Sequence, residues 1–419
     1  METGDAGYAC AGFAENKKGI METLVENQME QTGSSFRNEG PVRVIISGGG
    51  TGGHIFPAIA IANEIKRRKA DAEILFVGAE NRMEMEKVPA AGYRIVGLNV
   101  VGLNRKQWWK NFSLPFKLAK SLRQTRKLIK EFAPDVVVGV GGYASAPTLY
   151  SAQKLHIPTL LQEQNSLPGI TNRMLAKKAD RICVDYDEMD RFFPKEKIVW
   201  TGNPIRQDIS DINSKRDEAF SFYKLDPSMP VVLIMGGSLG ALSINVGVQN
   251  SLDYLLENGF QVIWQTGKYY YQRMLPSADG KEHLVMLDFV RRVDLAYAAA
   301  DIIVSRAGAI TISELCVVGK PVILVPSPNV AEDHQTKNAQ ALSAKNAAIL
   351  LSDDRCPQEL GKTVMSLYQD TRRRELLSQN IARMGTTTAS RDIVDEVLKL
   401  AKVGRWQKEN RKENKAKGK

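Results

Sequence analysis

The residues with the clearest chemical potential stand around a cluster of glycines that follows a short apolar run. Glycines fill most of residues 48–53, and His54 comes directly after them. Glycine lets the backbone approach a ligand closely, and the helix that follows presents free N–H groups at its start. A neutral imidazole at that position could accept a proton from a hydroxyl group. The alternative is that His54 only caps backbone groups at the start of the helix.

A second glycine-rich turn, residues 236–241, repeats this plan further along the chain. Either turn could hold a phosphate or the polar face of a sugar, although tight turns also need glycine for purely structural reasons. The first turn is not a dinucleotide fingerprint, because its glycines are packed together. No acidic residue ends the second strand, and Glu80 comes late, in a loop. Nicotinamide binding is therefore disfavoured.

Two later segments add polar groups at the starts of helices. Residues 305–314 follow an apolar strand and place Glu314 about one turn inside the next helix. Glu314 is either an ordinary first-turn acid, favoured by the helix dipole, or a carboxylate that accepts both hydroxyls of a ribose. Residues 333–338 open another helix, with the amide side chains of Gln335 and Asn338 on one face.

Alternating strands and helices must position these residues. Before the breaker at residues 201–204, strands are predicted at 42–46, 74–77, 135–140, 159–161 and 181–184, and helices at 55–68, 114–132, 144–154 and 170–176. The pattern then restarts, with strands at 231–235, 261–264, 284–286, 301–304, 321–325 and 348–350 and helices between them, one of them running from the second glycine turn to about residue 256. This alternation predicts an α/β protein with two doubly wound parallel sheets.

The domain boundaries follow from the same reading. Residues 1–40 are predicted to be a disordered extension. It contains Met21 and Met29, either of which could be the true translation start. The first domain covers 41–204 and the second 205–389. A last helix at about 390–401 is expected to pack back on the first domain, followed by a basic tail at 402–419.

Composition narrows the class. The chain has 419 residues, 43% hydrophobic and 25% charged, with a net charge of +10, which excludes a disordered, collagen-like or multi-span membrane protein. The 4 cysteines and 4 histidines are scattered, so we expect reduced thiols and no zinc site. The sequence shows neither the apolar run of a signal peptide nor one long enough for a transmembrane helix.

The positive charge is concentrated. Residues 101–130 hold nine Lys and Arg and no Asp or Glu, residues 402–419 are also basic, and residues 1–40 are acidic. The basic segment includes Lys106, Trp108, Trp109, Lys110, Phe112 and Phe116. It could be a helix with a core face and a solvated face, or bind nucleic acid, but no nucleic-acid motif accompanies it. Aromatic residues between cations favour an anionic membrane surface.

Eight segments in order and register resemble the MurG family of peptidoglycan synthesis, and the resemblance covers about residues 41–400. They are 48–57 (GGGTGGHIFP), 141–143 (GGY), 163–165 (EQN), 171–172 (TN), 202–206 (GNPIR), 236–238 (GGS), 305–314 (SRAGAITISE) and 335–338 (QTKN). The resemblance implies a GT-B fold, in which two Rossmann-like domains face each other across a cleft.

The resemblance also implies an activity. The family moves N-acetylglucosamine from UDP-N-acetylglucosamine to the 4-hydroxyl of the N-acetylmuramoyl unit of lipid I, with inversion, forming lipid II. It implies no metal and no other cofactor, and a place on the inner face of the cytoplasmic membrane beside other cell-wall and division proteins, with no nucleic acid. His54 and Glu314 would be the catalytic residues, and His54 is our candidate base.

The family motifs assign the remaining site residues. Arg206 and Ser238 would face the diphosphate, Phe289 and Val290 the uracil, Glu314 the ribose, and Gln335 and Asn338 the sugar. Thr51, Gly52, Gly53 and Asn165 would contact the donor from the first domain. His54, Tyr143 and Asn172 would line the acceptor side.

Three positions depart from the family pattern: Gln162, Leu239 and His334, the last with Thr336 and Lys337 beside it. Gln162 stands where many members have His, so it receives no catalytic role. Other hypotheses stay open: a GT-B transferase that uses another lipid acceptor such as diacylglycerol, a UDP-sugar 2-epimerase, or a non-catalytic scaffold that binds a UDP-sugar. Intact Arg206, Ser238, His54 and Glu314 argue against the scaffold.

Overall fold

Two parallel β-sheets organise the chain. A computed structural model describes residues 40–100, 114–237, 239–330 and 333–417, and gives no side chains for 114–116, 207 and 412–417. The first sheet has the order β3-β2-β1-β4-β5-β6-β7, and the pairs are parallel. Its strands are β1 (Arg43–Ser47), β2 (Glu73–Ala79), β3 (Arg94–Leu98), β4 (Val136–Gly139), β5 (Thr159–Glu163), β6 (Arg181–Val184) and β7 (Ile198–Trp200).

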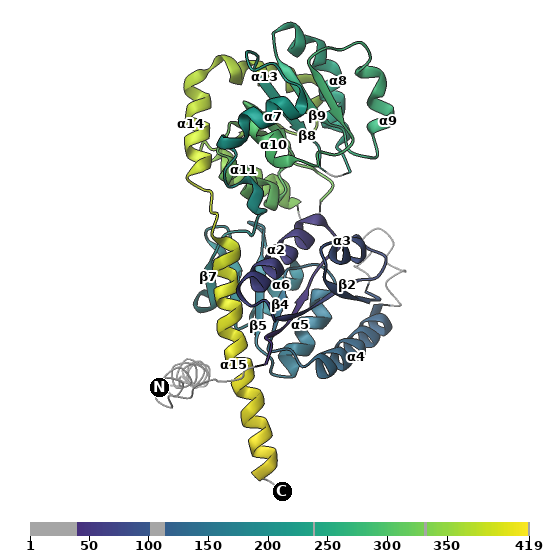
Figure 1. The fold of residues 1–419 in the computed structure, drawn as a ribbon, viewed down its shortest axis with the longest axis vertical. Coiled ribbons are helices and arrows are strands. Elements are labelled where there is room, and N and C mark those ends of the chain that lie inside the picture. The colour runs from purple at the N-terminus through teal and green to yellow at the C-terminus, as the bar shows by residue number, and fades with distance from the viewer. Residues whose placement is uncertain (1–39, 101–113, 238, 331–332, 418–419) are drawn as a thin grey trace, which may run out of the picture.

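Helices cover both faces of this first sheet (Figure 1). On one face, α2 (Gly52–Arg68), α3 (Glu84–Ala90) and the C-terminal α15 (Ala389–Lys417) contribute to a single apolar core with the strands. On the other face, α4 (Leu114–Phe132), α5 (Ser145–Lys154) and α6 (Ile170–Ala176) do the same. The strands read as continuous apolar runs because both faces are buried.

The second sheet has the order β10-β9-β8-β11-β12-β13 and is also parallel. Its strands are β8 (Val231–Met235), β9 (Gln261–Gln265), β10 (Leu284–Leu287), β11 (Ile302–Ser305), β12 (Val322–Leu324) and β13 (Ile349–Leu350). The predicted class, two doubly wound parallel-sheet domains, is therefore confirmed.

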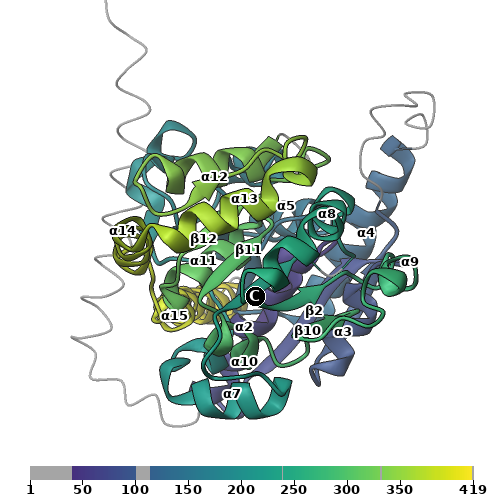
Figure 2. The ribbon, with the colours of Figure 1, turned by 90° about the horizontal axis from the view of Figure 1, so that it is seen from above.

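The helices of the second domain also form two layers (Figure 2). One layer holds α7 (Arg216–Tyr223), α10 (Val293–Ala299), α11 (Ala309–Val318) and α12 (His334–Ser343), and the other holds α8 (Leu242–Glu257) and α13 (Cys356–Gln369). Helix α14 (Thr371–Ala382) contributes to both cores, through Ile381 and Leu377 respectively. The short α9 (Tyr271–Met274) and 3₁₀ turns at Met189–Arg191, Lys195–Lys197, Gln207–Ile209, Asn213–Lys215 and Leu275–Ser277 complete the described elements.

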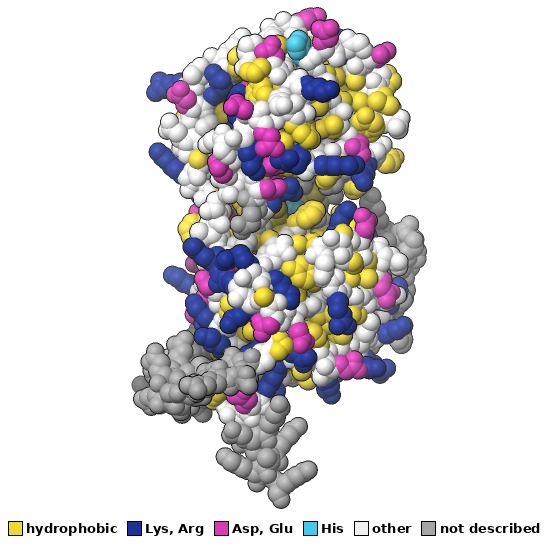
Figure 3. All heavy atoms as spheres, in the orientation of Figure 1, with side chains coloured by type: hydrophobic (Ala, Val, Ile, Leu, Met, Phe, Trp, Pro, Cys, Tyr) yellow, Lys and Arg dark blue, Asp and Glu magenta, His cyan; other side chains and the backbone are white. Residues whose placement is uncertain are grey.

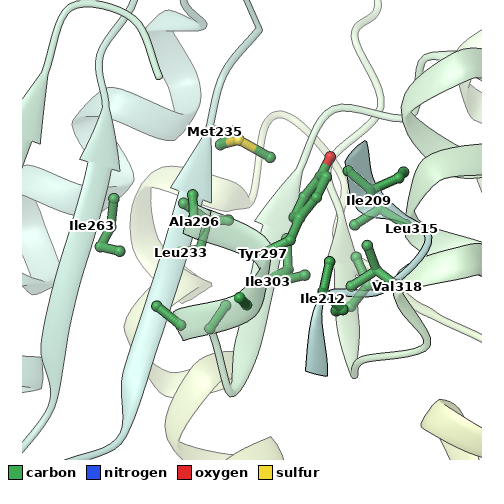
Figure 4. Close-up of a cluster of buried hydrophobic side chains, with 14 of the residues drawn as sticks. Ile209, Ile212, Leu233, Met235, Ile263, Ala296, Tyr297, Ile303, Leu315 and Val318 are labelled. Atoms are coloured by element: carbon green, nitrogen blue, oxygen red, sulfur yellow. The ribbon is translucent and has the colours of Figure 1, made fainter. Parts of the chain in front are cut away.

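The core of the second domain holds the side chain of Tyr297, which carries a polar hydroxyl group. Figure 4 shows the ring of Tyr297 among the side chains of Ile209, Leu315 and Val318, with its oxygen at one end of the cluster. Tyr297 is almost fully buried, so its hydroxyl needs a hydrogen-bond partner. That partner is the carboxylate of Glu314, described below.

The C-terminal helix corrects one prediction. We expected the helix to end near residue 401 and a basic tail to follow, but α15 continues to Lys417. Gly404 lets the helix approach the backbone of Asp135 so closely that a Cβ would lie 1.9 Å from its carbonyl oxygen. Arg405 and Lys408 donate to the buried Asp135 carboxylate at 3.1 and 2.6 Å. The tail is therefore helical because its cations bind the first domain.

The sequence missed the two edge strands of the first sheet. β3 and β7 each have one neighbour, and their residues are mostly half-buried or exposed. They lack the continuous apolar run that marks the inner strands. Cys183, Cys316 and Cys356 are buried and unpaired, as predicted, whereas Cys10 and the predicted disordered extension lie outside the described residues.

Candidate active site

The two sheets bring their glycine-rich turns to equivalent positions. In the first sheet the strand order runs outward in opposite directions from β1 and β4, and in the second sheet it does so from β8 and β11. Ligands of doubly wound proteins bind beyond the carboxyl ends of the strands at such a switch point. Residues 48–53 follow β1, residues 236–241 follow β8, and α11, which carries Glu314, contacts α2, which carries His54. The switch points of the two domains therefore face each other where the two lobes meet (Figure 3).

The first site is built from two glycine turns in contact. The Gly49 N–H donates to the Gly141 carbonyl at 3.3 Å, and a Cβ on Gly142 would lie 2.4 Å from the Gly49 carbonyl oxygen. Gly141 and Gly142 both have positive φ, at 94° and 88°. A Cβ on Gly141 would also lie 2.6 Å from Nε2 of His54. Glycine at position 141 therefore leaves the space that the imidazole occupies beside this turn.

His54 is half-buried on the first turn of α2. Its Nδ1 lies 3.0 Å from the hydroxyl of Thr51. Burial, reinforced by the nearby His334, lowers the pKa of His54 to about 4, and the negative Glu84 opposes this shift. The imidazole is therefore neutral near pH 7. If Nδ1–H donates to Thr51, Nε2 is free to accept a proton.

Two buried carboxylates that our sequence analysis assigned no role shape the first site. Glu84 accepts hydrogen bonds from the Gly50 and Ala79 amides, both at 2.9 Å. Glu163 accepts from the backbone amides of Asn165 and Gly169 and from the side chain of Asn172. Burial raises the pKa of Glu163. Glu84 lies in a polar stretch without a motif signal, whereas Glu163 ends β5 and opens the family segment 163–165. Only the folded chain reveals the partners of either acid.

The second glycine turn is fixed by its neighbours in the same domain. A Cβ on Gly240 would lie 2.1 Å from the Thr266 carbonyl oxygen, so the turn packs against the loop after β9. Gln265 donates to the Gly237 carbonyl at 2.9 Å and accepts from the Val290 amide at 3.0 Å. The guanidinium of Arg306 donates to the Ser243 hydroxyl, in the first turn of α8, at 3.0 Å. Arg306 also pairs with the Asp353 carboxylate, which accepts from the same Ser243 hydroxyl, so an ion pair stands beside the start of this helix.

Arg206 and Glu314 meet in the second domain. Arg206 Nε donates to Glu314 Oε1 at 3.0 Å, and the Tyr297 hydroxyl donates to Oε2 at 3.2 Å. Burial raises the pKa of Glu314, and the Arg206 guanidinium opposes the shift. The side chain of Arg206 is 36% exposed and that of Glu314 is 11% exposed. A carboxylate has further lone pairs, so Glu314 can still accept a hydroxyl.

Asn338 joins the two domains. Its Oδ1 accepts from the amide and the hydroxyl of Ser166, at 3.2 and 2.9 Å, and its Nδ2 donates to Asn165 Oδ1 at 3.4 Å. Asn338 is fully buried by these contacts. On the same helix, Gln335 accepts from the Ser327 amide at 2.9 Å. The predicted sugar-binding amides are therefore held in place from both sides of the interface.

The remaining predicted residues differ in accessibility. Tyr143 is 56% exposed, Phe289 is half-buried, and Gly52 and Gly53 open α2. Val290 and Asn172 are buried, and Asn172 Oδ1 has no hydrogen-bond partner among the residues that the structure describes.

The structure does not describe every predicted residue. Ser238 lies outside the described residues, as do most members of the predicted membrane segment (Lys106, Trp108, Trp109, Lys110 and Phe112), and the side chain of Phe116 is likewise not described.

The structure shows where the residues that depart from the family pattern lie. Gln162 donates to Asn203 Oδ1 in the interdomain linker at 2.8 Å, and Asn203 donates to Asp185 at 2.7 Å. Leu239 is 77% exposed beside the second glycine turn. His334 stands close enough to His54 to disfavour its protonation. Within the described ranges, no group of three His, Cys, Asp or Glu residues could hold a metal ion. None of the helices examined there is long and apolar enough to cross a membrane.

Comparison with known proteins identifies the class first. Two doubly wound domains with opposed switch points define a GT-B glycosyltransferase fold. The crystal structure of Acinetobacter baumannii MurG matches it with a TM-score of 0.69 at 26% identity, covering 86% of this chain and all of that one. Family models match as well: the glycosyltransferase family 28 N-terminal domain at residues 44–184 and the family 28 C-terminal domain at 231–397.

Curated relatives give the particular family. A protein from Parabacteroides distasonis is 54% identical, covering 85% of this chain and 98% of the relative, and one from Flavobacterium psychrophilum is 52% identical over 85% and 97%. Both are named UDP-N-acetylglucosamine–N-acetylmuramyl-(pentapeptide) pyrophosphoryl-undecaprenol N-acetylglucosamine transferase. The chain belongs to glycosyltransferase family 28 and, within it, to the MurG family.

Proposed function

We propose that the chain transfers N-acetylglucosamine from UDP-N-acetylglucosamine to the 4-hydroxyl of the N-acetylmuramoyl unit of lipid I, with inversion, and so forms lipid II. The observation that carries this proposal is the match, at 54% and 52% identity over nearly their full length, to relatives that bear this activity as their name. The opposed switch points support it, because a donor and an acceptor must meet between the domains.

The chemistry needs a proton acceptor and a place for the leaving charge. The acceptor oxygen forms a bond to the anomeric carbon, the bond from that carbon to the diphosphate breaks, and UDP leaves with the electron pair. We assign His54 Nε2 as the group that takes the hydroxyl proton, because Nδ1 is already paired with the Thr51 hydroxyl. Arg206 and Ser238 stabilise the departing diphosphate, as preorganised donors do.

The other contacts divide between the substrates. Glu314 binds the ribose hydroxyls, and the Phe289–Val290 backbone lies beside the uracil. Gln335, Asn338 and Asn165 surround the sugar, with Thr51, Gly52 and Gly53 opposite. Tyr143 faces the acceptor as an exposed ring, whereas the buried Asn172 acts through the loop it shares with Glu163.

Release of UDP tests this function. The purified chain is given UDP-N-acetylglucosamine with a lipid I analogue, and parallel reactions replace the donor by UDP-glucose or the acceptor by diacylglycerol. We expect release only with UDP-N-acetylglucosamine and the lipid I analogue together. Release with diacylglycerol indicates another lipid transferase, and binding of the donor without any turnover indicates a scaffold.

We also propose that the first domain docks on the anionic inner face of the cytoplasmic membrane, near other proteins of wall synthesis and division. The support is the charge of residues 101–130 and the exposed basic side chains of α4, among them Lys120, Arg123 and Lys127. Each cation near an anionic surface contributes roughly 1 kcal/mol of attraction.

Vesicle flotation tests the membrane surface. Arg123→Glu with Lys127→Glu should reduce flotation with phosphatidylglycerol-containing vesicles, while wild type floats poorly with neutral ones. The matched control reverses Arg372 and Arg373, which are exposed on α14 in the other domain. Equal binding to both vesicle types, or equal loss in the control, contradicts the proposed surface.

A further inference from the structure

Glu84 is a buried carboxylate without a cation. The side chain opens α3 and is 1% exposed. Among the residues that the structure describes, no Lys, Arg or His forms an ion pair with it. Both oxygens accept backbone hydrogen bonds instead, Oε2 from Gly50 and Oε1 from Ala79, each at 2.9 Å. Burying an unpaired charge is costly, so an acid in this position calls for a reason beyond filling space.

Glu84 also shapes the turn that it holds. A Cβ on Gly49 would lie 2.1 Å from Glu84 Oε1, and one on Gly78 would lie 2.6 Å from its Cγ. Gly49 and Gly50 have positive φ values of 153° and 87°. The glycines therefore leave room for the carboxylate, and the carboxylate holds the turn in a conformation that few other residues adopt. Thr51 and His54 follow directly, at the start of α2.

We propose that Glu84 is a positioning residue of the transfer reaction: its carboxylate fixes the turn that presents His54 and places a negative charge where an imidazolium would form. The inference rests on the proposed function, in which His54 accepts the proton of the acceptor hydroxyl. Glu84 touches no reacting atom, so its effect passes through the turn and through its charge. The same charge disfavours a phosphate at this turn.

The groups around His54 determine how the Glu84 charge affects its basicity. Glu84 and His334 act on it from α3 and α12, Thr51 lies on its own turn, and Gly141 lies beside the ring edge that carries Nε2. Burial and His334 lower the pKa of His54, and Glu84 raises it. Removing the charge therefore lowers the pKa further, makes His54 a weaker base and moves the acid limb of the rate profile to lower pH.

The decisive variant is Glu84→Gln, with Glu86→Gln as its control. Glu86 stands two residues away on the same helix, with a side chain that is 77% exposed and paired with Lys87. We expect Glu84→Gln to lower kcat about tenfold, less than the roughly 10²- to 10⁴-fold loss of the general base itself, with KM for UDP-N-acetylglucosamine within about twofold. We expect Glu86→Gln to match wild type in kcat, KM and pH profile.

A double variant separates positioning from general damage. If Glu84 acts through His54, His54→Ala with Glu84→Gln should be no slower than His54→Ala alone, because the losses are not independent. Losses that multiply overturn the proposal, as does Glu84→Gln with wild-type kcat and an unmoved acid limb.

Hydrogen exchange of the wild-type Gly50 amide keeps the proposal testable if Glu84→Gln does not fold. The amide should exchange slowly because its partner is buried, and rapid exchange overturns the proposal. A wild-type chain that never turns over lipid I defeats the proposed function, yet leaves this measurement of the Glu84 contact intact.

Discussion

The two glycine turns share a backbone plan and differ in the charge behind them. The first rests on the Glu84 carboxylate, which already occupies the Gly50 amide. The second precedes α8, where the Arg306 guanidinium binds the Ser243 hydroxyl in the first turn. A phosphate is disfavoured beside the first acid, which forms no ion pair among the described residues. At the second turn Arg306 balances the Asp353 carboxylate, so the start of α8 stays compatible with a phosphate. The comparison teaches that a glycine turn offers amides, whereas the side chain behind it decides which ligand those amides can take.

We therefore expect proton transfer at the first turn and binding of the charged donor in the second domain. Changes at the first should alter kcat, and changes at the second should alter the KM for the donor. Substitutions in the linker or at the interdomain contacts, which belong to neither turn, should alter stability more than kcat or KM. Four substitutions test this separation.

The largest effect is expected for His54→Ala. Loss of a general base costs about 10²- to 10⁴-fold, so kcat should fall at least a hundredfold while the Kd for UDP-N-acetylglucosamine stays the same. Steady-state kinetics and calorimetric titration measure the two quantities. His283→Ala, an exposed histidine of the second domain, is the matched control. Near-normal turnover with an unchanged pH profile would remove His54 as the base.

Glu314→Gln should act on the donor. The change leaves the side chain its shape but weakens its hydrogen bonds to Arg206 and to the ribose, and a bond to a charged group contributes about 1.5–3 kcal/mol. We expect KM for UDP-N-acetylglucosamine to rise about tenfold with a smaller change in kcat. Glu257→Gln, exposed on α8, should leave both constants unchanged. A fall in kcat alone would break the division between the two turns.

Asp185 tests the region between the domains. Its carboxylate accepts from Asn203 of the linker and Ser313 of the second domain, and burial raises its pKa to about 6. A raised folded-state pKa gives stability that is present below the unfolded value near 3.8 and lost as pH rises through about 6.

Asp185→Asn should therefore remove that loss. Relative to wild type, its free energy of unfolding should improve on the order of 1 kcal/mol between pH 4 and pH 7. Denaturant unfolding at both pH values measures it, with Asp190→Asn as an exposed control. A difference between variant and wild type that is constant with pH would show that Asp185 does not titrate in this range.

The smallest effect is expected for Lys345→Ala. Lys345 pairs with Asp187 across the domains at 3.0 Å, but the two side chains are 54% and 58% exposed. Such pairs contribute about 0–1 kcal/mol, so stability should change by less than about 0.5 kcal/mol and turnover not at all. Thermal unfolding and the UDP-release assay check this. A marked loss of activity would mean that this pair, as well as the buried Asn338 contacts, holds the domains in register.

The sequence by itself determined the fold class, the inner strands and the positions of the two glycine-rich turns. Apolar runs such as Val231–Met235 are recognisable because both faces of a parallel sheet are buried, and clustered glycines mark turns that few other residues adopt. The edge strands β3 and β7 were missed because half-buried residues leave no such run. The extent of α15 was missed because its cations look solvated until Asp135 binds them.

Only the tertiary structure decided how the site residues are held. His54 and Glu314 were visible from their positions at the starts of helices. Nothing local links Glu84 to Gly50, or Asn338 to Ser166, because the partners are 34 and 172 residues apart in the chain. The charge behind each glycine turn is a long-range property of packing. Sequence therefore located the amides and the imidazole, and folding set the electrostatic environment in which they act.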